Sequence, residues 1–102
     1  MDINYINLNE LKDVIKNNNL ILIVIKEEDQ VFKMMKAQLN KIKSYYSQFK
    51  YFIIKDEYAS NYFEKEFKVF PQIIITKRNN IISTIRGFRK TNILTNIIEV
   101  NF

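Results

Sequence analysis

The sequence predicts one α/β domain, residues 1–102, in which a mixed sheet of four or five strands carries helices on both faces. Two continuous apolar runs, 20–25 and 51–54, are typical of strands covered on both sides. Several longer segments instead repeat their apolar residues at helical spacing. A polar turn at 77–80 joins two more β-branched runs, as in a hairpin. With 102 residues and 47% hydrophobic residues, the chain can bury one compact core.

The first half of the chain is expected to alternate helix and strand. Apolar residues over 8–15 have helical spacing, and three consecutive Asn at 17–19 end that pattern. The run 20–25 then forms a central strand. The spacing over 31–49 predicts a helix of about five turns. Asp29 precedes this helix, where its carboxylate can cap the free amides of the first turn.

The second half is expected to add a strand, a helix, a hairpin and a last helix. The strand 51–54 follows a long helix, so it should run parallel to the first strand through a right-handed connection. A helical period covers 58–67. The segments 69–76 and 81–86 form the antiparallel hairpin, and the final helix includes 93–98. Stacking helices on both faces of such a sheet buries all of these apolar runs.

The composition excludes several kinds of chemistry. The chain has no Cys and no His, which excludes disulfides, thiol nucleophiles, Cys/His metal sites and imidazole acid–base catalysis. A single Gly excludes a glycine-rich phosphate loop. The serines have no histidine to activate them, and the three adjacent acids at 27–29 lack a fixed ligand spacing. We therefore expect no enzyme activity, no cofactor and no metal.

The expected location is the cytoplasm. The first residues lack the basic segment and apolar stretch of a secretory signal. The longest continuous apolar run, 20–25, is far shorter than the roughly 20 residues of a membrane span. We therefore expect no membrane contact.

The order of these elements, with one proline at the start of the hairpin, resembles the thioredoxin family over nearly the whole chain. Four local matches carry the resemblance: Lys33-Met34-Met35 with 39–42, the segment 69–75 around Pro71, the turn 78–82, and Arg86-Gly87-Phe88. The resemblance implies the thioredoxin-like fold, with Pro71 at the position of the family's cis-proline.

The chain departs from the family at the redox motif. Where thioredoxins carry Cys-x-x-Cys, this chain has Asp29, Gln30, Val31 and Phe32. Disulfide exchange needs a thiolate at the helix N-terminus and a second thiol to resolve the mixed disulfide. Ile23 also replaces the family's buried acid, although Lys55 matches a lysine often found in the family. We therefore expect a redox-inactive protein.

The resemblance implies a peptide-binding face, because the family's cis-proline loop leaves main-chain groups free to pair with an extended substrate. We expect a protein or peptide partner of unknown identity there, and a monomer or weak dimer. The alternative is that Pro71 only shapes the start of the strand, that the neighbouring aromatics are core, and that Asp29 only caps its helix. The predicted binding residues are Asp29, Gln30, Val31, Phe32, Phe70, Pro71, Gly87 and Phe88, flanked by Arg86, Arg89 and Lys90.

Two other functions stay open at this stage. The chain is also consistent with a homologue of a thioredoxin-type disulfide oxidoreductase, serving cell redox homeostasis, whose cysteines are lost or mutated. Alternatively, its net charge of +5 and a lysine-rich helix face favour weak, salt-sensitive binding of phosphate or nucleic acid. The sequence has no nucleic-acid motif, so we do not expect nucleic acid and interpret those lysines as a solvated face. Lys36 and Lys43, which are seven residues apart, share that face, and Lys33 lies one turn before Lys36. The lysines on the expected helix and its end are Lys33, Lys36, Lys41, Lys43 and Lys50.

Overall fold

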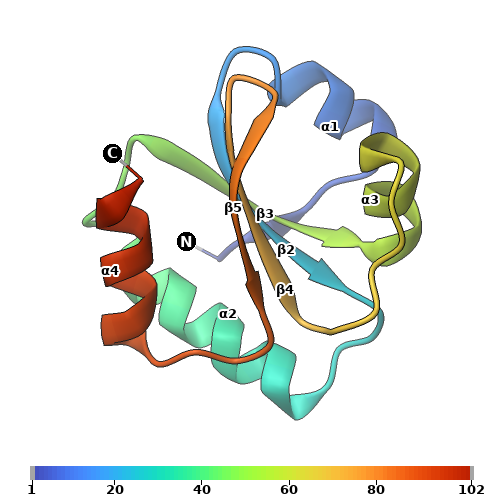
Figure 1. Ribbon diagram of the computed structural model, residues 1–102. Coiled ribbons are helices and arrows are strands. Elements are labelled where there is room, and N and C mark those ends of the chain that lie inside the picture. Colours follow the sequence, from blue (N-terminus) through green and yellow to red (C-terminus); the bar gives the residue numbers. More distant parts are fainter. Residues whose placement is uncertain (1, 102) are drawn as a thin grey trace.

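The computed structural model describes residues 2–101 and has a five-stranded mixed sheet between two layers of helices (Figure 1). The strands lie side by side in the order β1-β3-β2-β4-β5. The predicted α/β class and mixed sheet are therefore confirmed. The elements are β1 (Asn4–Tyr5), α1 (Leu8–Val14), β2 (Asn19–Ile25), α2 (Gln30–Ile42), β3 (Phe49–Lys55), α3 (Asp56–Phe63), β4 (Gln72–Lys77), β5 (Asn80–Arg86) and α4 (Thr91–Val100).

Strand β2 is the centre of the sheet. It pairs in parallel with β3 along its whole length, and antiparallel with β4 on its other side. Strands β4 and β5 form the predicted antiparallel hairpin. The sequence did not predict β1, which adds two residues in parallel to β3, because a pair of residues is too short to show a period of two.

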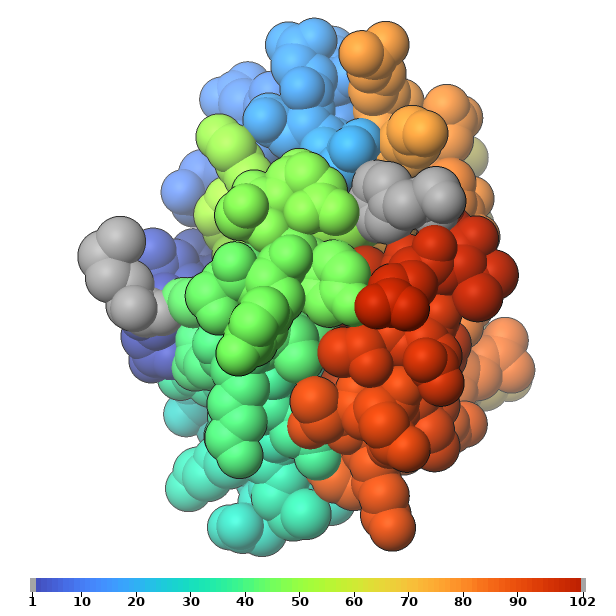
Figure 2. All heavy atoms as spheres, turned by 90° about the vertical axis from the view of Figure 1, so that its left-hand side faces the viewer, coloured from blue at the N-terminus to red at the C-terminus, as the bar shows by residue number. Residues whose placement is uncertain are grey.

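Successive residues of β2 point into two separate cores, one on each face of the sheet. Ile21, Ile23 and Ile25 pack with the buried residues of α2 and α4. The residues between them pack with Leu11 of α1 and Ala59 of α3. Helices α2 and α4 lie next to each other on their face, as Figure 2 shows. This two-sided burial is the reason that the run 20–25 contains no polar residue.

Two of the expected helices end earlier than their apolar spacing predicted. Helix α2 ends at Ile42, and Phe49 is instead the first residue of β3. Helix α3 ends at Phe63, followed by Glu64 in the left-handed conformation with φ of 53°. Phe49 lies in a strand and Phe67 in a loop, but both side chains are buried. Their spacing in the sequence therefore looked like the continuation of a buried helix face. No helix within residues 2–101 is long and apolar enough to cross a bilayer.

The hairpin starts later than predicted, and its register is irregular. Strand β4 begins at Gln72, so the preceding residues from position 69 form a loop. Asn79 has a positive φ of 72° in the turn, as expected of Asn, and Arg78 shares that conformation. Between β4 and β5 the register shifts at Ile75/Thr76, which leaves Ile82 without a register partner.

Candidate functional site

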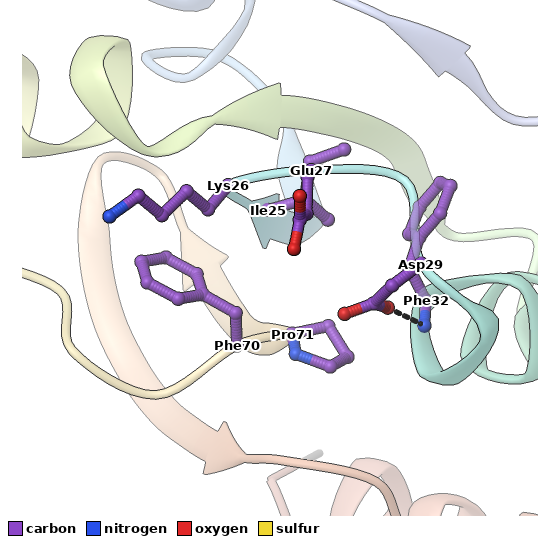
Figure 3. Close-up of a pocket in the computed structure, with 7 residues that line it drawn as sticks. All are labelled: Ile25, Lys26, Glu27, Asp29, Phe32, Phe70 and Pro71. Carbon is purple, nitrogen blue, oxygen red and sulfur yellow. Dashed lines mark hydrogen bonds between the residues drawn. The ribbon is translucent and has the colours of Figure 1, made fainter.

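A pocket of about 170 Å³ lies between the end of β2, the start of α2 and the loop that precedes β4. Figure 3 shows the carboxylates of Glu27 and Asp29 pointing into this space, with Phe70 and Pro71 on the opposite side. The walls are therefore partly apolar and partly acidic. The lining residues are Ile25, Lys26, Glu27, Asp29, Phe32, Phe70 and Pro71.

Asp29 is held in place as the N-cap of α2. Its Oδ1 accepts a hydrogen bond from the main-chain N–H of Phe32 at 2.8 Å, and its carbonyl accepts from Lys33 at 3.1 Å. Its own N–H donates to the carbonyl of Glu27 at 3.1 Å. A carboxylate at this position interacts favourably with the positive end of the helix. The predicted cap is confirmed, and the remaining carboxylate oxygen is directed at the pocket.

The proline loop, which we define as Val69, Phe70 and Pro71, forms the opposite wall. The Phe70–Pro71 peptide bond is cis, and the carbonyl of Pro71 accepts a hydrogen bond from the N–H of Gly87 at 2.8 Å. Gly87 has a φ of 76°, a conformation that favours glycine. Within residues 2–101, the main-chain groups of Val69 and Phe70 have no hydrogen-bond partner. These groups are thus available to a bound molecule.

The structure brings most of the predicted binding residues together. Four of them line the pocket, and Gly87 is bonded to the proline loop. Phe88 is half-buried and packs against the core that contains Phe32. Gln30 and Val31 lie in the first turn of α2, where they are exposed and outside the pocket lining. Whether these residues bind a partner stays a prediction.

Three pocket residues were missed by sequence reasoning: Ile25, Lys26 and Glu27. They form the end of β2 and the turn after it. Their position directly before the capping residue Asp29 was the available signal. Ligands of open α/β sheets commonly bind beyond the carboxyl ends of the strands, and these residues stand at such an end.

A second, wider cavity of about 440 Å³ adjoins the first through shared residues. It is lined by Tyr5 and Ile25 together with four charged side chains, from Lys26, Glu27, Glu28 and Lys55. The Tyr5 hydroxyl donates a hydrogen bond to Glu28. Burial, reinforced by this carboxylate, raises the pKa of Tyr5 to about 12, so its hydroxyl stays neutral at pH 7. The two lysines and two glutamates of the cavity balance each other in formal charge.

The site lacks the groups for thiol chemistry. The chain has no cysteine, so it cannot exchange disulfides. Ile23 is fully buried in β2, where the resemblance expects an acid. Residues 2–101 contain no group of three or more acidic, His or Cys side chains placed to hold a metal ion.

Of the five lysines expected on the long helix and its end, Lys33, Lys36 and Lys41 lie in α2. Lys43 is the C-cap of α2, and Lys50 lies in β3. Lys36 forms an ion pair with Asp2 at 2.8 Å, and this contact with the N-terminal segment neutralises it. The hydrogen bonds from Lys36 and Asn40 lower the pKa of Asp2 from 3.8 to about 2.

Comparisons with solved structures confirm the thioredoxin-like fold. The chain is similar to mitochondrial thioredoxin 3 from Saccharomyces cerevisiae in its oxidised form, with 24% identity, a TM-score of 0.76, and coverage of 96% of this chain and 94% of that one. It is also similar to a chain from work on the thiol resolving mechanism in yeast mitochondrial 1-Cys peroxiredoxin via glutathione/thioredoxin systems, with 20% identity, a TM-score of 0.75, and coverage of 96% and 94%.

A designed protein shares the fold at 13% identity, with a TM-score of 0.76 and coverage of 96% of this chain and 90% of that one. No protein family and no curated protein matches the sequence. At these identities the likeness concerns the fold alone. The two thiol-related neighbours and the cysteine-free sequence agree with a thioredoxin-like chain that lacks the Cys-x-x-Cys motif.

Proposed function

We propose that this chain is a redox-inactive, thioredoxin-like interaction module, which binds an extended segment of a partner protein at the proline loop. The observation that carries the proposal is the unpaired main chain of Val69 and Phe70 beside an open pocket. An extended peptide supplies the complementary N–H and C=O groups, as in other cases where peptides pair with free backbone.

The side chains around the loop support a peptide more than a small metabolite. Phe70 is half-buried and presents part of its ring, and its chain neighbour Val69 is 45% exposed. A partly exposed aromatic residue next to an apolar one is the kind of anchor that protein interfaces use. The pocket beside the loop, of about 170 Å³, is by itself smaller than the cavities of about 300–1,000 Å³ that hold drug-sized ligands. The adjoining cavity of about 440 Å³ is lined mainly by charged side chains, whereas such ligands favour apolar walls.

The proposal is tested by selecting binders from a random ten-residue peptide library and mapping the selected peptides by NMR on ¹⁵N-labelled protein. The expected result is that the largest shift changes occur at the amides of Val69, Phe70 and Gly87. Phe70→Ala should weaken binding by about tenfold, since interface aromatics commonly contribute at least 1 kcal/mol.

Tyr45→Ala is the matched control, because Tyr45 is an aromatic residue that is 82% exposed beyond the far end of α2. It should leave the affinity unchanged. Peptides that bind Phe70→Ala as tightly as the parent, or that perturb only amides away from the proline loop, would contradict the proposed function.

A further inference from the structure

A smaller pocket of about 110 Å³ lies on the other side of the proline loop, and we call it the Gln72 pocket. It is formed by the chain that follows α3, by Val69, and by the paired residues Gln72 and Arg86. Because Gln72 and Arg86 are cross-strand partners, their side chains lie on the same face of the hairpin. The lining residues are Lys65, Glu66, Lys68, Val69, Gln72 and Arg86.

The Gln72 pocket has an excess of positive charge. Three of its six lining residues are cations, and only Glu66 is an acid. Within residues 2–101 the one ion pair is Lys36 with Asp2, so none of the three cations is neutralised by a salt bridge. The Lys65 ammonium instead lies 5.1 Å from the centre of the Phe67 ring. An anion in the pocket would therefore meet cations that have no carboxylate partner.

Gln72 gives the pocket a second, independent feature. Its side chain is only 3% exposed, and its amide nitrogen has no hydrogen-bond partner among the described residues. A buried amide without a partner is unfavourable, and most such groups in folded proteins are satisfied. Gln72 also lines the pocket, so a rotation of its side chain would let this amide donate to an oxygen ligand that pairs with the neighbouring cations.

The two pockets share the proline loop but differ in charge. Phe70 and Pro71 line the first pocket, which has two acids and one lysine, whereas Val69 lines the Gln72 pocket. A segment that crosses the loop can therefore place neighbouring side chains into both. Charge complementarity directs an acidic side chain to the Gln72 pocket and away from the acids Glu27 and Asp29.

We propose that the Gln72 pocket binds the carboxylate of an Asp or Glu side chain in the extended partner segment. This inference rests on the proposed function for the segment itself. The pocket selects among partners by charge, while the proline loop holds the main chain. A pocket of about 110 Å³ accommodates a carboxylate, since one water molecule occupies roughly 30 Å³ in the liquid.

The experiment uses three capped pentapeptides that differ only at the central residue, Val-Ala-Xaa-Ala-Val, with Xaa as Glu, Gln or Lys. Each is titrated into the full ¹⁵N-labelled chain at low salt, alongside sodium acetate and inorganic phosphate. We expect the Glu peptide to bind about fivefold more tightly than the Gln peptide, and the Lys peptide to bind most weakly. The Glu peptide should also shift the side-chain amide resonance of Gln72.

Arg86→Gln should remove the preference for Glu over Gln, and the exposed position of Arg86 makes misfolding a small risk. Lys50→Gln makes the same change in net charge at an exposed position of β3 and should keep the preference. Gln72→Leu removes the buried amide without changing the charge, and should reduce the preference while it preserves the fold.

Equal affinities for the Glu and Gln peptides, with shifts at Phe70, would overturn the inference and leave the proposed function standing. If acetate shifts Gln72 while no peptide perturbs Phe70, the anion pocket is supported and the proposed function fails. Inorganic phosphate that binds the pocket more tightly than the Glu peptide would overturn the assignment to a peptide carboxylate. An equal loss of preference in Lys50→Gln and Arg86→Gln would also overturn it, as an effect of net charge alone.

Discussion

Replacement of Thr76 by valine should stabilise the protein. Thr76 lies in β4 between Leu20 and Ile81, is fully buried, and has a hydroxyl without a hydrogen-bond partner among the described residues. Burial strips water from this hydroxyl without replacing the lost hydrogen bond. Valine fills nearly the same volume without that cost, so the free energy of unfolding should rise by about 1–2 kcal/mol.

Urea denaturation measures this change directly. With a slope of about 1–2 kcal/mol per molar urea for a small domain, the midpoint should rise by about 1 M at unchanged slope. The melting temperature should rise by about 4–8 °C for each kcal/mol. Thr84→Val on exposed β5 is the control, and it should change stability by less than about 0.5 kcal/mol. A midpoint that stays constant or falls in Thr76→Val would show that the hydroxyl is satisfied in solution, and the reasoning would be wrong.

Three further changes test the loop and the N-terminal contacts. Asp29→Ala should lower the free energy of unfolding by about 1 kcal/mol in urea denaturation, whereas Asp29→Asn, which still caps, should cost less. Gly87→Ala should lower the free energy of unfolding by about 1–2 kcal/mol, because Gly87 has a φ of 76°. A Cβ at this position would meet only Arg89, at 3.9 Å, so no steric clash is expected. An unchanged urea midpoint would therefore contradict the conformational argument. The pKa of Asp2, measured by NMR, should be about 2 and should return toward 3.8 in Lys36→Met. This lowered pKa stabilises the fold at neutral pH, and the stabilisation should be lost as the pH falls from about 4 through 2. An unchanged pKa in the variant would refute the ion pair.

The sequence predicted those parts of the fold whose burial is two-sided or strictly periodic. The run of β2 has no polar residue, and the hairpin has a clear polar turn, so both were predictable. The ends of α2 and α3 were not predictable, because Phe49 and Phe67 are buried although neither lies in a helix. No local pattern distinguishes a buried residue in a loop from one more turn of helix.

The candidate site was predictable where its residues are close in sequence. Asp29 and Phe32 share a helical turn, and Phe70 and Pro71 are adjacent. The Gln72 pocket could not be predicted in this way. It depends on the face of the hairpin that Gln72 occupies and on where the chain after α3 passes, and tertiary packing sets both.

The register shift between β4 and β5 has a consequence for self-association. Among the described residues, strand β5 is the outer strand on its side of the sheet, and one of its edges has no neighbouring strand. A long, regular edge would be a template for uncontrolled sheet growth between molecules. The register shift at Ile75/Thr76 leaves an extra residue in β5, which interrupts the regular spacing of its main-chain N–H and C=O groups. A strand of a second molecule could therefore not form an unbroken row of hydrogen bonds along this edge. A solubility advantage is thus built into the backbone of the hairpin, separately from the repulsion between molecules of net charge +5.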